Sequence, residues 1–119
     1  MKRFLLLFVL FGPQLAQAQD LDASQINEEL VGHSITWSDA NGWANGSLVL
    51  LPSGKAEITV THPQEARDAG QWTLDGNTIC TVWNSMRQGQ AKCYSVRQVK
   101  PGHFVTSGGN EFEIQYFGV

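Results

Sequence analysis

The sequence predicts an all-β fold, a small antiparallel meander of about eight strands closed as a barrel, with one short N-terminal helix. After residue 32, apolar and polar residues alternate along short segments, as in strands that are buried on one face. Turn-forming residues recur about every 8 to 12 residues, which is typical of barrels and sandwiches. Closure into a barrel removes the two open edges of such a sheet, and a two-sheet sandwich is the alternative.

Residues 1–18 are predicted to be a removable signal peptide. Two basic residues precede an apolar run over 4–11, and small residues lead to an expected cleavage site near Ala18. The remaining residues, 19–119, are expected to form a single β-barrel domain. The apolar run is far shorter than the roughly 20 residues of a membrane span, so no span is expected in the mature chain. The predicted location is therefore periplasmic or secreted.

The charge of the chain disfavours a nucleic-acid-binding function. The formal net charge is −3, and loss of Lys2 and Arg3 with the signal makes the mature protein more acidic. Binding to phosphate backbones requires clustered cations. Four of the remaining basic residues do gather around one predicted hairpin, where they indicate a solvated face or, alternatively, contact with an acidic partner: Arg87, Lys92, Arg97 and Lys100.

The expected helix begins at Asp22 and ends before Gly32. Asp22 is a favoured N-cap residue, and Gln25 follows it at the spacing of a capping box. Ile26 and Leu30 lie one turn apart and form an apolar stripe. A helix of about eight residues is not stable alone in water. We therefore expect this stripe to pack against the rest of the fold.

The expected strands follow one another with short turns between them. The second is expected to contain a bulge at Asn45 and Gly46. Segment 62–69, which is polar and contains Pro63, is expected to be the longest loop. The eight expected strands cover residues 35–38, 43–51, 55–61, 70–74, 78–83, 91–98, 103–107 and 112–116.

Cys80 and Cys93 are predicted to form a structural disulfide. An even number of cysteines in a short exported chain favours a disulfide. Both residues lie equally far from a turn centred between Met86 and Arg87, which makes them direct cross-strand partners. A redox-active pair is the alternative, but the Cys-x-x-Cys spacing that would activate a thiol is absent.

Tryptophan is the most distinctive feature of the composition, with four residues in a small chain. These rings either pack the barrel interior or line a space for one small ligand, since a barrel of eight strands allows both. Trp72 is expected to face inward beside Leu74 as a core anchor. Trp43 directly follows a turn, so we predict that it lies at an accessible rim and binds a ligand. Alternatively, Trp43 covers the core as a lid.

No group of residues predicts catalysis, a metal site or a cofactor. The three histidines lie in separate segments, and neither a nucleophile elbow nor a glycine-rich nucleotide loop is present. Glu111 and Glu113 lie on one face of the last expected strand. Because apolar residues alternate with them, that face is expected to be solvated. We therefore expect a protein that is not an enzyme.

Four short motifs carry a resemblance to known proteins. They are Gly32-His33-Ser34-Ile35, Gly70-Gln71-Trp72, Cys80-Thr81-Val82-Trp83 and Cys93-Tyr94-Ser95-Val96. Together they resemble a group of small exported bacterial domains of unknown function. More distantly, the Gly-x-Trp element is similar to lipocalin-like and streptavidin-like barrels and to periplasmic metalloprotease inhibitors. The resemblance implies a small exported barrel and assigns no activity to it.

These observations favour a non-catalytic binding module of the cell envelope. Its partner would be an unidentified protein or small ligand that contacts a barrel end or loop 62–69, because loops on a rigid scaffold commonly carry function. The alternative hypothesis is an inhibitor or immunity-type protein that blocks a secreted hydrolase.

Overall fold

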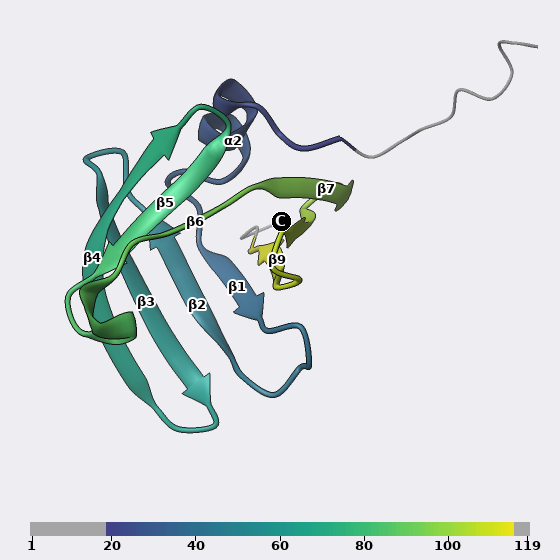
Figure 1. The fold of residues 1–119 in the computed structure, drawn as a ribbon. Helices are drawn as coiled ribbons and strands as arrows, with labels where there is room; N and C mark the ends of the chain where they lie inside the picture. The colour runs from purple at the N-terminus through teal and green to yellow at the C-terminus, as the bar shows by residue number, and fades with distance from the viewer. Residues whose placement is uncertain (1–18, 116–119) are drawn as a thin grey trace, which may run out of the picture.

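The structure, a computed structural model, describes residues 19–115 as a nearly closed barrel of nine antiparallel strands with one short helix (Figure 1). The predicted signal peptide 1–18 and Tyr116 at the end of the last expected strand lie outside the described residues. None of the helices in the described part has the length and apolarity needed to cross a membrane.

The strands form one continuous antiparallel sheet with the order β6-β5-β4-β3-β2-β1-β9-β8-β7. The prediction of an all-β meander barrel is confirmed, and the two-sheet sandwich is wrong, since every strand belongs to one sheet. The bulge in the second strand is also confirmed, because the register shifts between Asn45 and Gly46. The strands are β1 (Ile35–Ser38), β2 (Asn45–Leu50), β3 (Lys55–His62), β4 (Ala66–Asp75), β5 (Thr78–Trp83), β6 (Lys92–Tyr94), β7 (Val96–Lys100), β8 (His103–Thr106) and β9 (Glu111–Ile114).

The ninth strand arises because the expected strand 91–98 is divided at Ser95. Before this residue β6 pairs with β5, and after it β7 pairs with β8. Ser95 itself bonds to the end of β8, where its carbonyl oxygen accepts from Ser107 N at 2.9 Å and its amide donates to Ser107 Oγ at 3.2 Å. One continuous segment therefore occupies both edges of the sheet and joins them.

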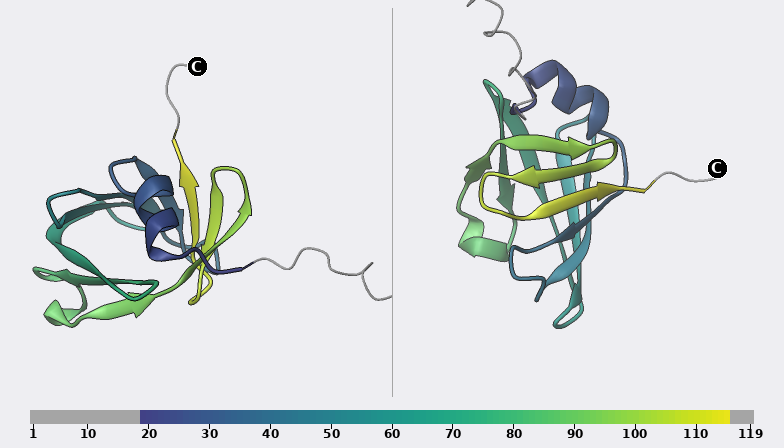
Figure 2. Two further views of the ribbon diagram at one scale, coloured as in Figure 1. Left: turned by 90° about the horizontal axis from the view of Figure 1, so that it is seen from above. Right: turned by 90° about the vertical axis from the view of Figure 1, so that its right-hand side faces the viewer.

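Helix α2 (Ala23–Glu29) lies across one end of the barrel (Figure 2). Asp22 is the N-cap, and the predicted capping box with Gln25 is present. The predicted stripe of Ile26 and Leu30 is fully buried. Beneath the helix, apolar side chains from seven strands and from the segment before the helix complete a packed core: Leu21, Ile35, Leu50, Ala56, Ile79, Val96, Phe104 and Ile114.

The predicted long loop over 62–69 is wrong. Strand β3 continues to His62 and β4 begins at Ala66, so only three residues form the turn. Val60 pairs with Ala66 and Thr59 with Arg67 in a regular antiparallel ladder. The polar composition has a physical reason, because this end of the hairpin is exposed on both faces and has little apolar surface to bury.

The disulfide joins Cys80 and Cys93, which are direct partners in the β5–β6 ladder, as their symmetric placement predicts. Their neighbours Ile79 and Thr81 are buried in the barrel. Because side chains alternate along a strand, the disulfide lies on the outer face. It fastens the short strand β6 to the sheet without occupying the interior.

Replacing both cysteines by serine should lower the free energy of unfolding by about 2–4 kcal/mol, because the bond closes a loop in the unfolded chain. Chemical denaturation followed by tryptophan fluorescence measures this loss, and reduction of the wild-type protein should reproduce it. An unchanged denaturation midpoint after reduction would contradict a structural role.

Candidate functional site

The β5–β6 connection lies at the end of the barrel opposite α2 (Figure 1). Side chains at this end line a cavity of about 630 Å³. The sequence allows two alternatives for the interior, packed or able to hold a ligand. In the structure the helix end is packed and the other end is hollow. Large apolar side chains from β1, β2, β3, β5, β6 and β9 form most of the cavity wall: Trp37, Leu48, Ile58, Trp83, Tyr94 and Phe112.

Trp37 contributes its ring to the wall and leaves the centre of the barrel free. It pairs across the strands with Gly46. Because Gly46 has no side chain, nothing at that position holds the Trp37 ring away from the sheet. The Trp37 indole Nε1 donates to the carbonyl oxygens of Ser47 at 3.2 Å and Thr59 at 3.3 Å. The ring therefore reaches across β2 to β3 along the barrel wall.

Trp83 is likewise paired with a glycine on the neighbouring strand. It pairs with Gly70, and a Cβ atom on Gly70 would lie 3.0 Å from Cε3 of the Trp83 ring. The same Cβ would overlap the carbonyl oxygen of Val82. Gly70 thus lets the Trp83 ring lie against β4. Both tryptophans are thus paired with glycines across the strands. Because a glycine has no side chain, each ring can pack against the neighbouring strand, and the centre of the barrel stays open.

Trp72, the other residue of the Gly-x-Trp motif, has a different role. Its side chain is buried, as predicted, and its indole Nε1 donates to the carbonyl oxygen of Leu51 at 2.8 Å. Its backbone amide donates to the carbonyl oxygen of Gly54. Trp72 therefore anchors β4 to the β2–β3 turn and does not line the cavity.

The cavity meets the edge of the sheet beside β6. Strand β6 pairs with β5 over three residues, and no other strand in the described part of the chain pairs with it. We call the opening of the cavity at this unpaired edge the mouth. Its residues come from the β5–β6 connection, from β6 and from the β8–β9 turn. The mouth residues are Arg87, Lys92, Ser107, Gly108 and Asn110.

Asp68 fixes the turn that carries Arg87. Its Oδ2 atom accepts hydrogen bonds from the amides of Met86 at 2.8 Å and Ser85 at 2.9 Å. These two bonds hold the pKa of the Asp68 carboxyl below its ordinary value. The turn needs such support, since Arg87 and Gln88 have φ angles of 58° and 54°, in the left-handed region that side chains disfavour.

Tyr94 places a polar group in the apolar wall. Its ring packs edge-on against Phe112 with the ring centres 6.1 Å apart. Burial raises the pKa of the Tyr94 phenol, and the nearby Arg87 guanidinium opposes part of that rise. The phenol is therefore neutral at physiological pH. Within residues 19–115, neither the Tyr94 hydroxyl nor the Trp83 indole nitrogen takes part in a hydrogen bond.

Trp43, the predicted ligand-binding residue, lies outside the cavity. Its side chain is 60% exposed, and its ring contacts the His62 ring edge-on with centres 5.2 Å apart. His62 Nδ1 also lies 3.1 Å from the Trp43 carbonyl oxygen, which orders this corner of the barrel. The binding role of Trp43 stays a prediction.

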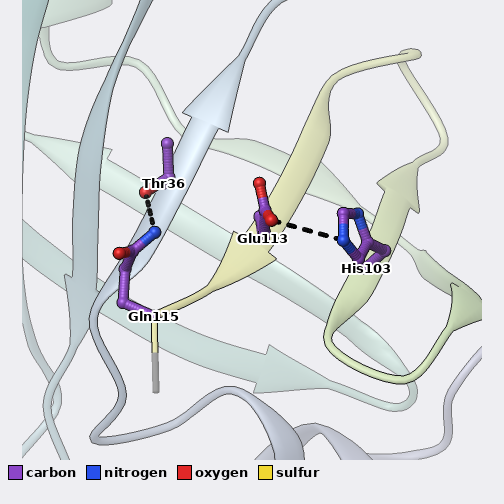
Figure 3. A network of polar contacts seen from close by, with 4 residues as sticks. All are labelled: Thr36, His103, Glu113 and Gln115. Carbon is purple, nitrogen blue, oxygen red and sulfur yellow. Dashed lines mark hydrogen bonds and ion pairs between the residues drawn. The ribbon is translucent and has the colours of Figure 1, made fainter. Parts of the chain in front are cut away.

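The other polar cluster lies on the outer face of β1, β8 and β9 (Figure 3). His103 Nε2 lies 3.3 Å from Glu113 Oε2, with the two side chains 40% and 53% exposed. Gln115 Nε2 donates to Thr36 Oγ1 at 2.7 Å. Glu111 is also exposed, which confirms the solvated face predicted for this strand. Within residues 19–115, no three histidine, cysteine or acidic side chains meet as a metal site.

Three residues on which the cavity depends are not among those that the sequence indicates as site residues. Asp68 falls in the segment expected to be a loop, and nothing in the local sequence points to the interior role of Gly46 and Gly70. A usable signal exists, because Gly46 and Gly70 fall opposite Trp37 and Trp83 once the strands are placed in register.

Gly70→Ala should destabilise the fold by about 1–3 kcal/mol, the usual effect of overpacking, because the new Cβ meets the backbone of β5. Gly108→Ala is the matched control, since a Cβ there contacts nothing within 4 Å. Thermal or urea denaturation gives both values. Equal stability of the two variants would show that β4 does not approach β5 as described.

The Asp68 anchor should depend on pH in a defined direction. A carboxyl with a lowered pKa stabilises the fold above its ordinary pKa and loses this contribution as pH falls through the lowered value. In an NMR titration from pH 6 to 2, the amide signals of Ser85 and Met86 should therefore shift with a midpoint below the ordinary aspartate pKa. Asp68→Asn should abolish this titration. A midpoint at or above the ordinary value would contradict the anchor.

No protein-family model, curated protein or solved structure significantly matches this chain. The resemblance to small exported bacterial domains therefore stays a prediction.

Proposed function

We propose that this protein is a non-catalytic module of the periplasm or extracellular space that binds one small, largely apolar ligand in its barrel cavity. The observation that carries this proposal is the cavity itself. Its volume of about 630 Å³ falls within the range of roughly 300–1,000 Å³ that is typical of ligand pockets. Its wall is mostly aromatic and aliphatic, and a few polar groups remain free to orient a ligand.

The chemistry of the lining supports binding over catalysis. Among the described residues, no histidine, aspartate or glutamate lines the cavity. These side chains supply most general acids and bases in enzymes. Thr81, Thr106 and Ser107 supply hydroxyls, but among the described lining residues neither a histidine nor a carboxylate accompanies them to activate a nucleophile.

The proposed location rests on two features. The disulfide between Cys80 and Cys93 is the kind of bond that persists in oxidising compartments. The expected signal peptide over 1–18 would direct the chain to such a compartment.

Exposed Trp43 supports a second candidate, an inhibitor or immunity-type protein acting on a secreted hydrolase. Large exposed aromatic residues often anchor protein interfaces, and Trp43 is ordered by its contacts with His62. This function would use the outer corner of the β1–β2 connection. Trp43→Ala would then abolish partner binding, whereas filling the cavity would leave it unchanged.

Titration with N-phenyl-1-naphthylamine, a neutral apolar fluorophore, tests the proposed function. Its fluorescence should rise and saturate at one molecule per chain. Thr81→Phe places a ring in the cavity and should weaken binding by at least about tenfold. Val82→Phe is the matched control, because Val82 is the next residue on the strand and is exposed on the outer face. This control should bind like the wild type.

A second pair of variants keeps the test valid if Thr81→Phe does not fold. Ile58→Trp fills the cavity from β3, and Glu57→Trp places the same ring on the outer face. The proposed function is overturned if the wild type shows no saturable binding. It is equally overturned if folded Thr81→Phe and Ile58→Trp bind the fluorophore as well as their controls do.

A further inference from the structure

We propose that the ligand is an organic anion with a flat ring body, whose charged group is held at the mouth by Arg87 and Lys92. This inference rests on the proposed function and specifies its ligand class. It is carried by the charge at the mouth, the position of the two cations and the aromatic character of the wall.

The mouth has a positive charge that contrasts with the protein as a whole. The chain contains 11 acidic and 8 basic residues, yet its described cavity lining includes two cations and no carboxylate. The ion pair of His103 and Glu113 on the outer face is the only one within residues 19–115. Arg87 and Lys92 are therefore without an acidic partner in the described part of the chain.

The structure fixes both cations near the same side of the cavity. Arg87 extends from the turn held by Asp68, whose Oδ2 oxygen is already bonded to the amides of Ser85 and Met86. Lys92 lies in β6, where the adjacent disulfide fastens the strand. This support fixes the backbone position from which the Lys92 side chain extends, so binding does not have to order the strand itself.

Tyr94 extends the same polar edge into the cavity. It lies two residues after Lys92, so both side chains are on the inner face of β6. Arg87 and Tyr94 line the same cavity, and the Arg87 charge lowers the pKa of the Tyr94 phenol against the effect of burial. A guanidinium, an ammonium and a neutral phenol together supply donors for carboxylate or sulfonate oxygens.

The rest of the wall fits a ring better than an alkyl chain. Trp37 and Trp83 lie against the strands over their glycines, and Tyr94 and Phe112 meet edge-on. Aromatic rings gain from stacked and edge-on contacts beyond the area that they bury. A flat ring body uses these surfaces, while its anionic group reaches the cations at the mouth.

Two fluorophores with the same ring system test the charge. 8-Anilinonaphthalene-1-sulfonate differs from N-phenyl-1-naphthylamine by its sulfonate group. We expect the anion to bind the wild type more tightly, with an affinity that falls as salt is added. The Arg87→Gln, Lys92→Gln double variant should bind the anion about tenfold more weakly, and its affinity for the neutral fluorophore should fall by a clearly smaller factor.

The Arg97→Gln, Lys100→Gln double variant is the matched control. It removes the same charge from exposed residues outside the cavity lining and should bind both fluorophores like the wild type. Equal loss of anion binding in the two double variants would overturn the proposed role of the mouth, as would equal wild-type affinities for the two fluorophores. If the wild type still binds the neutral fluorophore saturably, either of these results overturns only the proposed ligand class and leaves the proposed function intact. If the wild type does not bind the neutral fluorophore, the proposed function and the proposed ligand class are both overturned.

Competition tests the ring body. 1-Naphthoate should displace 8-anilinonaphthalene-1-sulfonate at lower concentrations than octanoate does, since both carry one carboxylate and differ in the apolar part. More effective displacement by octanoate would overturn the inference of a flat ring.

Discussion

The candidate site depends on one constraint, that a single segment of chain occupies both edges of the sheet. At Ser95 the backbone leaves β5 and joins β8. The disulfide at Cys93 secures the segment before this corner, and the bond from Leu21 N to Val96 O secures it after the corner. Within residues 19–115, β6 pairs with β5 alone, whereas β7 pairs with β8 and forms a bridge to Asp20 at the helix end. The edge of β6 is therefore left without a partner strand beside the cavity.

The two ends of the barrel differ in where their aromatic and apolar side chains lie. At the helix end, Ile26 and Leu30 enter from above and complete a packed core. At the other end, within residues 19–115, no α-helix covers the interior, and Trp37 and Trp83 pair with glycines across the strands. The packed end supplies stability, so the fold does not require the other end to be filled.

Much of the fold could be predicted from local sequence patterns. The capping box at Asp22, the bulge at Gly46 and the pairing of Cys80 with Cys93 each have a short-range signature. The strand at 66–69 could not be recognised, because both of its faces are largely exposed and it lacks alternation. The break at Ser95 was equally hidden, since it depends on hydrogen bonds to the distant Ser107.

The cavity was harder to predict than the fold, because an empty volume depends on where side chains point. Composition showed many aromatic residues and allowed either a filled or a hollow interior. Only the cross-strand register reveals that Trp37 and Trp83 face glycines. The role of Asp68 could likewise not be predicted from the sequence, since its partners are backbone amides in a different hairpin.

Methyl NMR under xenon pressure tests the hollow barrel most directly, because xenon enters apolar cavities without needing a specific ligand. The structure predicts that the methyl signals of Leu48 and Ile58, which line the cavity, shift and saturate with xenon pressure. The signals of Ile26 and Leu50 in the packed end should stay constant. Unchanged signals at Leu48 and Ile58, or equal shifts at both ends, would contradict a cavity confined to the end opposite the helix.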